Sequence, residues 1–459
     1  MNYYKNDKDT FDYDNVIEYL DEVDRKGVIG GQTFVDAYGN PFFTRHDYPI
    51  PSVITTIPST NYYCIRGSHP ICDFSNNIYF PISTITNIGI LKMNTNNLTE
   101  SVILQHTTLP STFGNGSPVA GSDKHCIVPS GLIVGSTKNT TGVISQLLDI
   151  NTSLVDTSKF KSTSITATTS GKLSETWGNP VYNKKHNCVY FTPTDNNMEA
   201  TDSWCRLNLN NNPYTLESYS FGYEAGEYWD GKYRNGVHTK NNRIFLIPYL
   251  MNSSSTSTKL HYIDCSGVSP VVQSYSSGTF VSELHSLSTS GIYNGGVYVP
   301  SLDRIYFIPS FQCLETVGKK LHYIQNCSTT PSIASYTHNL TTNWSDTSLQ
   351  NRYINGLYIG NGLIFMIPIE QCTLSTFHLI DTKNNTIIEY NSFLSSTALP
   401  VVERVSGWIA GATLVGDKIF FSYNAGTKIT GQTSWFYLNL NHNMPYSVQY
   451  TSHPLKLNS

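Results

Sequence analysis

The sequence predicts an all-β fold: a seven-bladed β-propeller of four-stranded antiparallel blades, preceded by a short N-terminal helix-plus-hairpin extension. The main observation is a phrase that recurs seven times, at intervals of 54 to 61 residues, between Ile78 and Tyr423. One clear copy contains Gly295-Gly296-Val297-Tyr298-Val299, Arg304-Ile305-Tyr306-Phe307-Ile308-Pro309, Leu321-His322-Tyr323-Ile324-Gln325 and Ile333-Ala334-Ser335-Tyr336. Each copy therefore predicts four short strands. A fixed repeat of this length is the signature of a repeat architecture.

Two independent positions in the repeat give the same count. The second strand begins its hydrophobic run at Ile78, Leu132, Val189, Ile244, Ile305, Ile364 and Ile419. The third strand carries a recurring hydrophobic residue at Leu91, Leu148, Leu207, Ile263, Ile324, Ile380 and Leu438. The copies are rich in Ile, Val, Tyr and Phe and are bounded by Gly, Asn, Pro and Ser, which is typical of strands and turns.

The repeat favours closure into a ring. A four-stranded antiparallel unit cannot bury both of its faces alone, and about 4 to 8 such units close radially into a propeller. The alternative is an open solenoid, whose terminal copies are normally atypical caps. The seventh copy here is nearly as regular as the fourth. It is expected to supply all four of its own strands, ending near Tyr450, although residues 53–57 offer a further outer strand.

The repeat resembles the kelch-like group of propeller repeats, in variants built on a phrase such as NGKIYFIP followed by VLVID. The matching segments are Asn242–Pro248 with Tyr262-Ile263-Asp264, and Gly362–Pro368 with Leu379-Ile380-Asp381. The resemblance covers about residues 61 to 452. It implies an architecture and no particular activity, because propellers host enzymes, lectins and scaffolds alike. The first, second and seventh copies depart from the pattern at Pro81, Gly135 and Ser422.

Residues 1–60 do not fit the repeat and are predicted to form an anchor or cap, with the propeller in residues 61–459. Asp14 can cap a short helix that ends near Lys26, before Gly27. A strand, turn and strand follow over residues 30–43. The turn Asp36-Ala37-Tyr38-Gly39-Asn40-Pro41 resembles the attachment domains of phage tail fibre and tailspike proteins. The alternative is a plug or flap that closes one propeller face.

Composition excludes several classes of function. Charged residues are 14% of the chain and the net charge is −4, without a Lys or Arg stripe, so no nucleic-acid partner is expected. No apolar run is long enough to insert in a membrane. The N-terminus has no signal-peptide core, which predicts synthesis in the cytoplasm. Few charges with many Tyr, Ser and Asn residues fit an adhesive surface, or alternatively an AT-rich genome.

No cofactor, metal site or catalytic residue is predicted. The four histidines His238, His261, His285 and His322 lack metal-ligand spacing. The cysteine count is nine, and Cys188 and Cys205 are expected to be buried thiols. Cys313 and Cys372 occupy equivalent positions in adjacent copies, which leaves a disulfide between them as a less favoured alternative.

The candidate ligand-binding residues are tryptophans and polar neighbours placed in the long connections between blades. They are Trp177, Glu227, Tyr228, Trp229, Asp230, Tyr233, Arg234, Trp344, Trp408 and Glu403. Flat aromatic faces beside carboxylates and amides suit sugar binding, because the ring stacks on C–H surfaces and the polar groups take hydroxyls. Alternatively, each tryptophan wedges between blades. Trp204 and Trp435 precede the third-strand hydrophobic residue and are expected in the core.

These features favour a virion-associated protein, of a phage or another virus, displayed on the virion or another extracellular surface. Residues 1–60 would bind other assembly proteins, and the propeller would contact a host glycan or surface receptor. Three alternatives remain: a purely structural virion decoration or connector, an intracellular kelch-like interaction scaffold, and a polysaccharide-cleaving enzyme using the loop acids.

Overall fold

The computed structural model describes an all-β chain. It covers the strands and the closest turns between them, in residues 43–49, 63–64, 71–72, 77–83, 88–94, 101–106, 125–128, 132–135, 147–149, 154–155, 160–161, 177–193, 203–212, 214–220, 233–248, 259–276, 278, 293–309, 320–339, 353–360, 362–368, 376–391, 407–415, 418–425 and 432–439. Within these ranges the helical element is one 3₁₀ turn, η2 (Pro300–Leu302). No helix there is long and apolar enough to cross a bilayer. The helix expected over residues 14–26 and the hairpin expected over residues 30–43 lie outside them, apart from Phe43.

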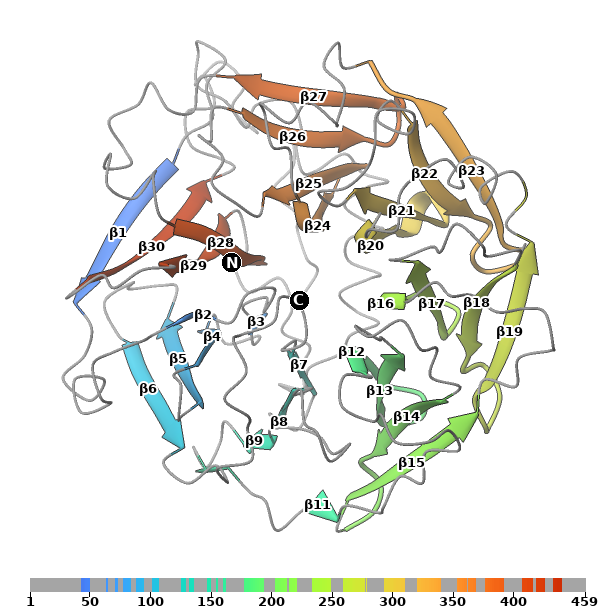
Figure 1. The fold of residues 1–459 in the computed structure, drawn as a ribbon, viewed down its shortest axis with the longest axis horizontal. Helices are drawn as coiled ribbons and strands as arrows, with labels where there is room; N and C mark the ends of the chain where they lie inside the picture. The colour runs from blue at the N-terminus through green and yellow to red at the C-terminus, as the bar shows by residue number, and fades with distance from the viewer. Residues whose placement is uncertain are drawn as a thin grey trace, which may run out of the picture.

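The described strands form seven sheets around a common axis (Figure 1). The first sheet contains β2 (Tyr63–Cys64), β3 (Ile71–Cys72), β4 (Asn77–Ser83), β5 (Ile88–Asn94) and β6 (Ser101–His106); the second contains β7 (His125–Ile127), β8 (Leu132–Gly135), β9 (Leu147–Asp149) and β10 (Leu154–Val155); and the third contains β11 (Phe160–Lys161), β12 (Trp177–Asn183), β13 (Cys188–Pro193), β14 (Ser203–Asn208) and β15 (Tyr214–Ser220). The fourth sheet contains β16 (Tyr233–His238), β17 (Arg243–Pro248), β18 (Lys259–Asp264) and β19 (Val271–Ser276), and the fifth contains β20 (Tyr293–Val299), β21 (Arg304–Pro309), β22 (Lys320–Gln325) and β23 (Ser332–Thr337). The sixth sheet contains β24 (Tyr353–Gly360), β25 (Leu363–Pro368), β26 (Thr376–Asp381) and β27 (Thr386–Asn391), and the seventh contains β28 (Gly407–Val415), β29 (Lys418–Ala425) and β30 (Gln432–Asn439) with β1 (Phe43–Pro49).

Most sheets are antiparallel meanders that run outward from the axis, as in β16-β17-β18-β19. The two sequence positions that marked the repeat lie directly opposite each other in five sheets, as Val189↔Leu207, Ile244↔Ile263, Ile305↔Ile324, Ile364↔Ile380 and Ile419↔Leu438. In the first two sheets the register is offset, with Ile78 opposite Met93 and Leu132 opposite Asp149. Of the three copies whose sequences depart from the pattern, the first two therefore also differ in register, whereas the seventh keeps the regular register.

The first sheet has an interrupted inner strand. β2 pairs with Ile82 and Ser83, and β3 pairs with Ile78 and Tyr79, so both lie on the same edge of β4. The two residues between them are Phe80 and Pro81, and proline has no N–H to donate to a ladder. The displaced proline noted in the sequence therefore coincides with the break in the inner strand.

The last sheet takes its outer strand from the beginning of the chain. β1 pairs antiparallel with β30 along seven residue pairs, from Phe43↔Leu438 to Pro49↔Gln432. The expectation that the seventh copy supplies all four strands is wrong, because β29 and β1 already occupy the two edges of β30. Residues 53–57 and 440–459 lie outside the described part.

A further strand, unexpected from the sequence, joins the third sheet. β11 pairs parallel to β15.

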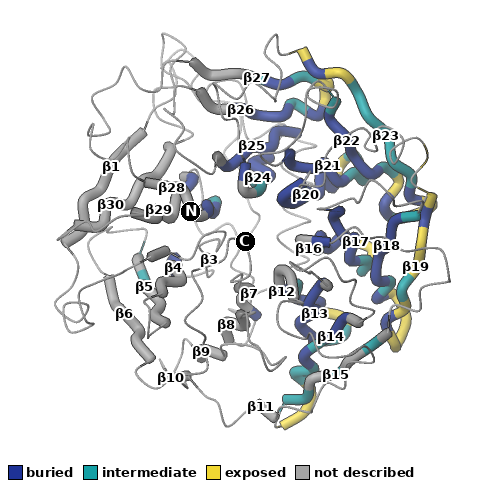
Figure 2. The backbone as a smooth tube through the Cα atoms, in the orientation of Figure 1, coloured by how far each residue is buried: buried dark blue, intermediate teal, exposed yellow. Residues whose placement is uncertain are grey.

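Burial falls from the axis outward (Figure 2). The second strand β17 is buried from Ile244 to Pro248, whereas the outer strand β19 is mostly exposed. Ile244 and Leu246 pack in one cluster with the third sheet, and Phe245 and Ile247 pack in another with the fifth. A strand that is covered on both faces needs an unbroken apolar run, which explains why the phrase Ile-Phe-Leu-Ile does not alternate.

Neighbouring sheets approach most closely at the inner strands. Each inner strand contacts the next, from β3 through β7, β12, β16, β20 and β24 to β28, which contacts β3 again. At Gly296 in β20, a Cβ atom would lie 2.8 Å from Cδ1 of Ile247 in the preceding sheet and 2.9 Å from Cγ2 of Ile305. Glycine is required here because the neighbouring isoleucine occupies the space of a side chain.

The turns between the first and second strands share one backbone conformation. The residue before the second strand has positive φ in four consecutive sheets: Asn187 (47°), Asn242 (57°), Asp303 (50°) and Gly362 (74°). These residue types tolerate the left-handed region best. Each of their carbonyls accepts an N–H from the first or second residue after the third strand, namely Leu209 at 3.1 Å, Cys265 at 2.8 Å, Cys327 at 3.2 Å and Thr382 at 2.9 Å. Each of these turns therefore links the first, second and third strands of its sheet.

These turns define one end of the sheets, which we call the turn face. Its described residues are 184–187, 209–212, 239–242, 265–270, 300–303, 326–331 and 382–385. Contacts across sheet junctions hold it together: Arg243 donates to the carbonyls of Cys327 and Thr329 of the next sheet, both at 2.8 Å. We call the opposite end, where the chain passes from one sheet to the next, the connection face.

The substitution Gly296→Ala is expected to lower the free energy of unfolding by about 1–3 kcal/mol, because the added methyl group overpacks the junction between two sheets. Gly267→Ala is the matched control, since a Cβ there meets only the Ser269 carbonyl at 3.5 Å. Urea unfolding of both variants checks the expectation. Equal stabilities would show that the junction yields without cost.

Candidate functional site

The inner strands of three consecutive sheets begin, at the connection face, with the same buried pair. Tyr233, Tyr293 and Tyr353 open β16, β20 and β24 and are at most 3% exposed. Their hydroxyls lie 2.7, 2.6 and 2.5 Å from Nδ1 of His261, His322 and His378 in the third strands of the same sheets. A buried tyrosine hydroxyl needs such a partner, so each pair ties the inner strand to the third strand across the second.

Side-chain amides link these inner strands to one another. Asn294 donates to the backbone carbonyl of Tyr353 in the next sheet. At Gly295, a Cβ would lie 2.3 Å from Oδ1 of Asn355 and 3.0 Å from Nδ2 of Asn235, so amides from the sheets on both sides converge there. The connection face therefore rests on a floor of bonded tyrosines, histidines and amides.

The candidate ligand residues divide into three groups. Glu227, Tyr228, Trp229, Asp230, Trp344 and Glu403 lie outside the described residues. Arg234 is in β16 next to Tyr233, whose side chain belongs to the floor and is 2% exposed. Trp177 and Trp408 were expected in connections, but they lie in the inner strands β12 and β28.

The position of Trp177 has a simple reason. It faces Pro193, the last residue of its second strand, just as Tyr233 faces Pro248. Trp177 therefore occupies the strand position that tyrosine fills in the next three sheets. Trp204 lies in the core as expected, 1% exposed and stacked on Tyr219 with ring centroids 4.3 Å apart. Trp435 lies in β30.

The Tyr–His pairs were missed at the level of sequence. The histidines were judged scattered because only metal-ligand spacing was considered. His261, His322 and His378 each follow the first apolar residue of a third strand, in Leu-His-Tyr, Leu-His-Tyr and Phe-His-Leu. The tyrosines recur 60 residues apart, at 233, 293 and 353. Alignment of the copies on both strands would have paired them.

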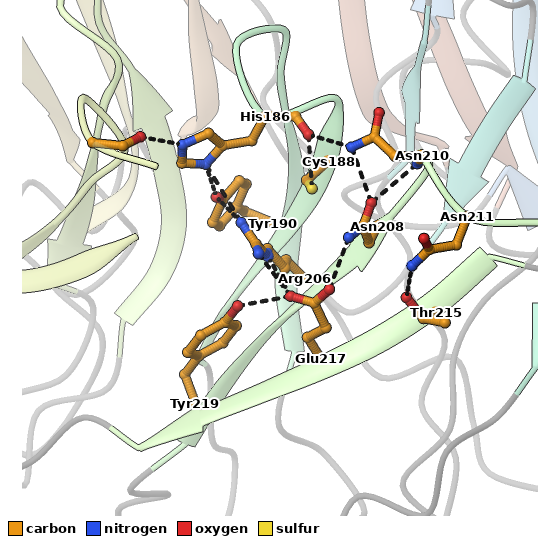
Figure 3. A network of polar contacts seen from close by, with 11 residues as sticks. His186, Cys188, Tyr190, Arg206, Asn208, Asn210, Asn211, Thr215, Glu217 and Tyr219 are labelled. Atoms are coloured by element: carbon orange, nitrogen blue, oxygen red, sulfur yellow. Dashed lines mark hydrogen bonds and ion pairs between the residues drawn. The ribbon is translucent and has the colours of Figure 1, made fainter. Parts of the chain in front are cut away.

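A second polar cluster lies on the third sheet (Figure 3). Arg206 in β14 forms an ion pair with Glu217 in β15, with Nη2 and Oε2 2.7 Å apart. Tyr219 donates to the same carboxylate at 2.7 Å, and Asn208 donates to its other oxygen at 2.8 Å. Burial alone would raise the pKa of Glu217, but these hydrogen bonds and the guanidinium lower it. A general acid needs a raised pKa, so this carboxylate does not suit that role.

The cluster also joins two sheets. His186 lies with Nδ1 2.5 Å from the hydroxyl of Tyr190, and its Nε2 lies 2.7 Å from the carbonyl of Gly267 in the next sheet. A carbonyl only accepts, so Nε2 donates to it, and in a neutral ring Nδ1 then accepts from Tyr190. Burial raises the pKa of Tyr190 and keeps its hydroxyl protonated. Donors and acceptors are matched throughout, as expected of a structural network.

The same junction contains a buried histidine without charge. Asn183, fully buried in β12, donates to Nε2 of His238 in β16 at 3.1 Å. An amide nitrogen only donates, so Nε2 is unprotonated. Burial lowers the pKa of His238 from 6.5 to about 4. Each of these groups has a structural role at the sheet junction.

Cys188, Cys205, Cys265 and Cys327 are free and buried, as expected for the first two. Cys313 and Cys372 lie outside the described part. Within that part, no group of three His, Cys, Asp or Glu side chains is placed to hold a metal.

Comparison with known proteins gives only distant likenesses. No protein-family model matches the chain, and no curated protein sequence matches it. The fold is similar to the β-propeller domain of Cps50 (Swd1) from Myceliophteria thermophila, with 7% identity, a TM-score of 0.45, and coverage of 82% of this chain and 98% of that one. It is also similar to the WD40 domain of Toxoplasma gondii coronin, with 8% identity, a TM-score of 0.45, and coverage of 87% and 88%.

A third similar structure is an oligogalacturonate lyase in complex with manganese, with 9% identity, a TM-score of 0.47, and coverage of 87% of this chain and 97% of that one. Similarity at this level carries no argument about what the chain does. The chain's own four-stranded sheets around one axis make it a β-propeller.

The substitution His238→Gln is expected to flatten the pH dependence of stability between pH 6.5 and pH 4. The unfolded chain binds a proton at this histidine below pH 6.5, whereas the folded chain binds it only near pH 4. The free energy of unfolding therefore falls as the pH falls through this window, by up to about 3 kcal/mol from this group. Glutamine still accepts from Asn183 and does not titrate. Urea unfolding at several pH values would contradict this if both proteins kept the same slope.

Proposed function

We propose that this chain is a seven-bladed propeller with kelch-like repeats whose connection face binds a glycan on a host-cell surface. The blade number is supported by the seven sheets and by the continuous run of contacts between inner strands. Kelch-like ancestry is supported by the shared phrase of the fourth and sixth sheets, Asn242–Pro248 and Gly362–Pro368.

The observation that carries the binding proposal is the composition of the connection between β15 and β16. Residues 221–232 contain Phe221, Tyr223, Tyr228 and Trp229, together with Glu224, Glu227, Asp230 and Lys232. This sequence joins Ser220 on the outer strand of one sheet to the buried Tyr233 of the next. The sequence of this connection therefore supplies aromatic rings suited to stacking and carboxylates suited to hydroxyls, between two described strands.

The rigid floor suits binding more than catalysis. The Tyr–His pairs and the amides beneath the face are engaged with one another, and Glu217 is an ion-paired carboxylate away from it. A rigid floor lowers the entropic cost of ordering the groups that bind a ligand above it. Attachment of residues 1–60 to a virion or a comparable assembly is part of the proposal, and it is supported by the turn Asp36–Pro41 and by the composition.

The test is the binding of labelled full-length protein to bacterial and eukaryotic cells, with and without enzymatic removal of surface glycans. Binding is expected to depend on glycans and to weaken about tenfold in Trp229→Ala, which corresponds to about 1.4 kcal/mol. The control is Val268→Ser on the turn face, where the side chain is 94% exposed, and it should bind as the wild type does.

Other outcomes would replace this proposal. Failure to bind any cell would favour a virion connector or an intracellular scaffold. Release of reducing ends from a polysaccharide, abolished by Asp230→Asn, would make the protein a hydrolase.

A further inference from the structure

The turn face gathers exposed lysines. Among the exposed side chains that the structure describes, the charged ones are four lysines: Lys184, Lys185, Lys240 and Lys383. All four lie in the turns of this face. The chain as a whole has more acidic residues than basic ones, 33 against 29, so this distribution is not a reflection of overall composition.

The carboxylates beside these turns accept backbone N–H groups, and Asp264 also lies 3.6 Å from Nε of Arg243. Asp264 accepts the N–H of Ser266, Asp303 accepts the N–H of Ser328, and Asp381 accepts the N–H of Lys383. Two of the lysines lie against neutral carbonyls: Lys185 donates to Ser266, and Lys240 donates to Pro300 at 3.5 Å. A carbonyl fixes an ammonium group without cancelling its charge.

Negative charge is concentrated near the start of the same chain. Residues 7–24 contain eight carboxylates, at Asp7, Asp9, Asp12, Asp14, Glu18, Asp21, Glu22 and Asp24, and one base, Lys8. This acidic segment has a formal charge of −7. The rest of the chain then has 25 acidic and 28 basic residues, or +3, which adds to the net charge of −4.

The topology brings the acidic segment toward the lysines. β1 begins with Phe43 opposite Leu438, and Leu438 is also opposite Ile419, next to the turn between β28 and β29. The chain therefore enters β1 from the turn-face end of the last sheet. Eighteen residues separate Asp24 from Phe43, and they can span about 60 Å. One four-stranded sheet is about 15 Å wide, so the acidic segment can reach the lysines of other sheets.

We propose that the acidic segment, residues 7–24, docks on the turn face of its own propeller and is held there by Lys184, Lys185, Lys240 and Lys383. The contact is mainly electrostatic, so it weakens with ionic strength. It leaves the connection face uncovered. The inference does not depend on glycan binding, and either proposal can fail without the other.

The test compares lysine acetylation in two full-length proteins: the wild type and a variant in which the eight carboxylates are replaced by amides (Asp→Asn and Glu→Gln). At low salt the four turn-face lysines are expected to react several times faster in the amide variant. Lys259 and Lys320 are internal controls, because they begin third strands at the connection end of their sheets. Their rates should stay the same, and far-ultraviolet circular dichroism should show that both proteins are folded.

Salt and concentration complete the design. Addition of 0.5 M NaCl should raise the wild-type rates toward those of the variant. Equal rates in both proteins at low salt would overturn the proposal. Protection that appears only as protein concentration rises would overturn it as well, since the segment would then bind a second copy.

Discussion

The structure depends on the close contact of each sheet with the next along the inner and second strands. The second strand is covered on both sides, so Phe245 and Ile247 face one neighbour while Ile244 and Leu246 face the other. At Gly296 that contact leaves so little room that an added Cβ atom would lie 2.8 Å from Cδ1 of Ile247. Sheets held at this distance bring the turn of one within reach of its neighbour, as Arg243 bonded to the carbonyls of Cys327 and Thr329 shows.

Much of the fold was predictable because it is repeated. A buried strand must be apolar throughout, and a turn with positive φ favours Asn, Asp or Gly, so these demands recur, as the turn residues Asn187, Asn242, Asp303 and Gly362 of four sheets show. The two sequence positions that marked the repeat meet across strands in five of the sheets, as at Ile244 and Ile263. Prediction succeeded where one physical requirement recurs, and it was weakest in the first two sheets, where Pro81 and the shifted register at Leu132 break the pattern.

The remaining features could not be predicted, for identifiable reasons. The pairing of β1 with β30 joins residues almost 400 positions apart, and strand pairing between distant segments leaves no local signal. The candidate site was only partly predictable. The residues around Trp177 have the composition of a loop, but Trp177 lies in a strand, at the position equivalent to Tyr233. That placement depends on its pairing with Pro193, which local composition does not reveal. The Tyr–His pairs combine two strands and become visible only when the copies are aligned with each other.

The two faces of the propeller differ in what their side chains can still do. At the connection face the buried side chains are bonded among themselves, as Tyr293 is to His322, so new chemistry must come from the segments that join the sheets. At the turn face the lysines are exposed, while the aspartates accept backbone N–H groups of the turns, as Asp303 does from Ser328. A propeller leaves only short, protected strand edges at its axis with which to bind a partner. Its interactions are therefore expected at these two faces and at the outer strands, and the strand β1 on β30 shows that an outer edge accepts a segment from far along the chain.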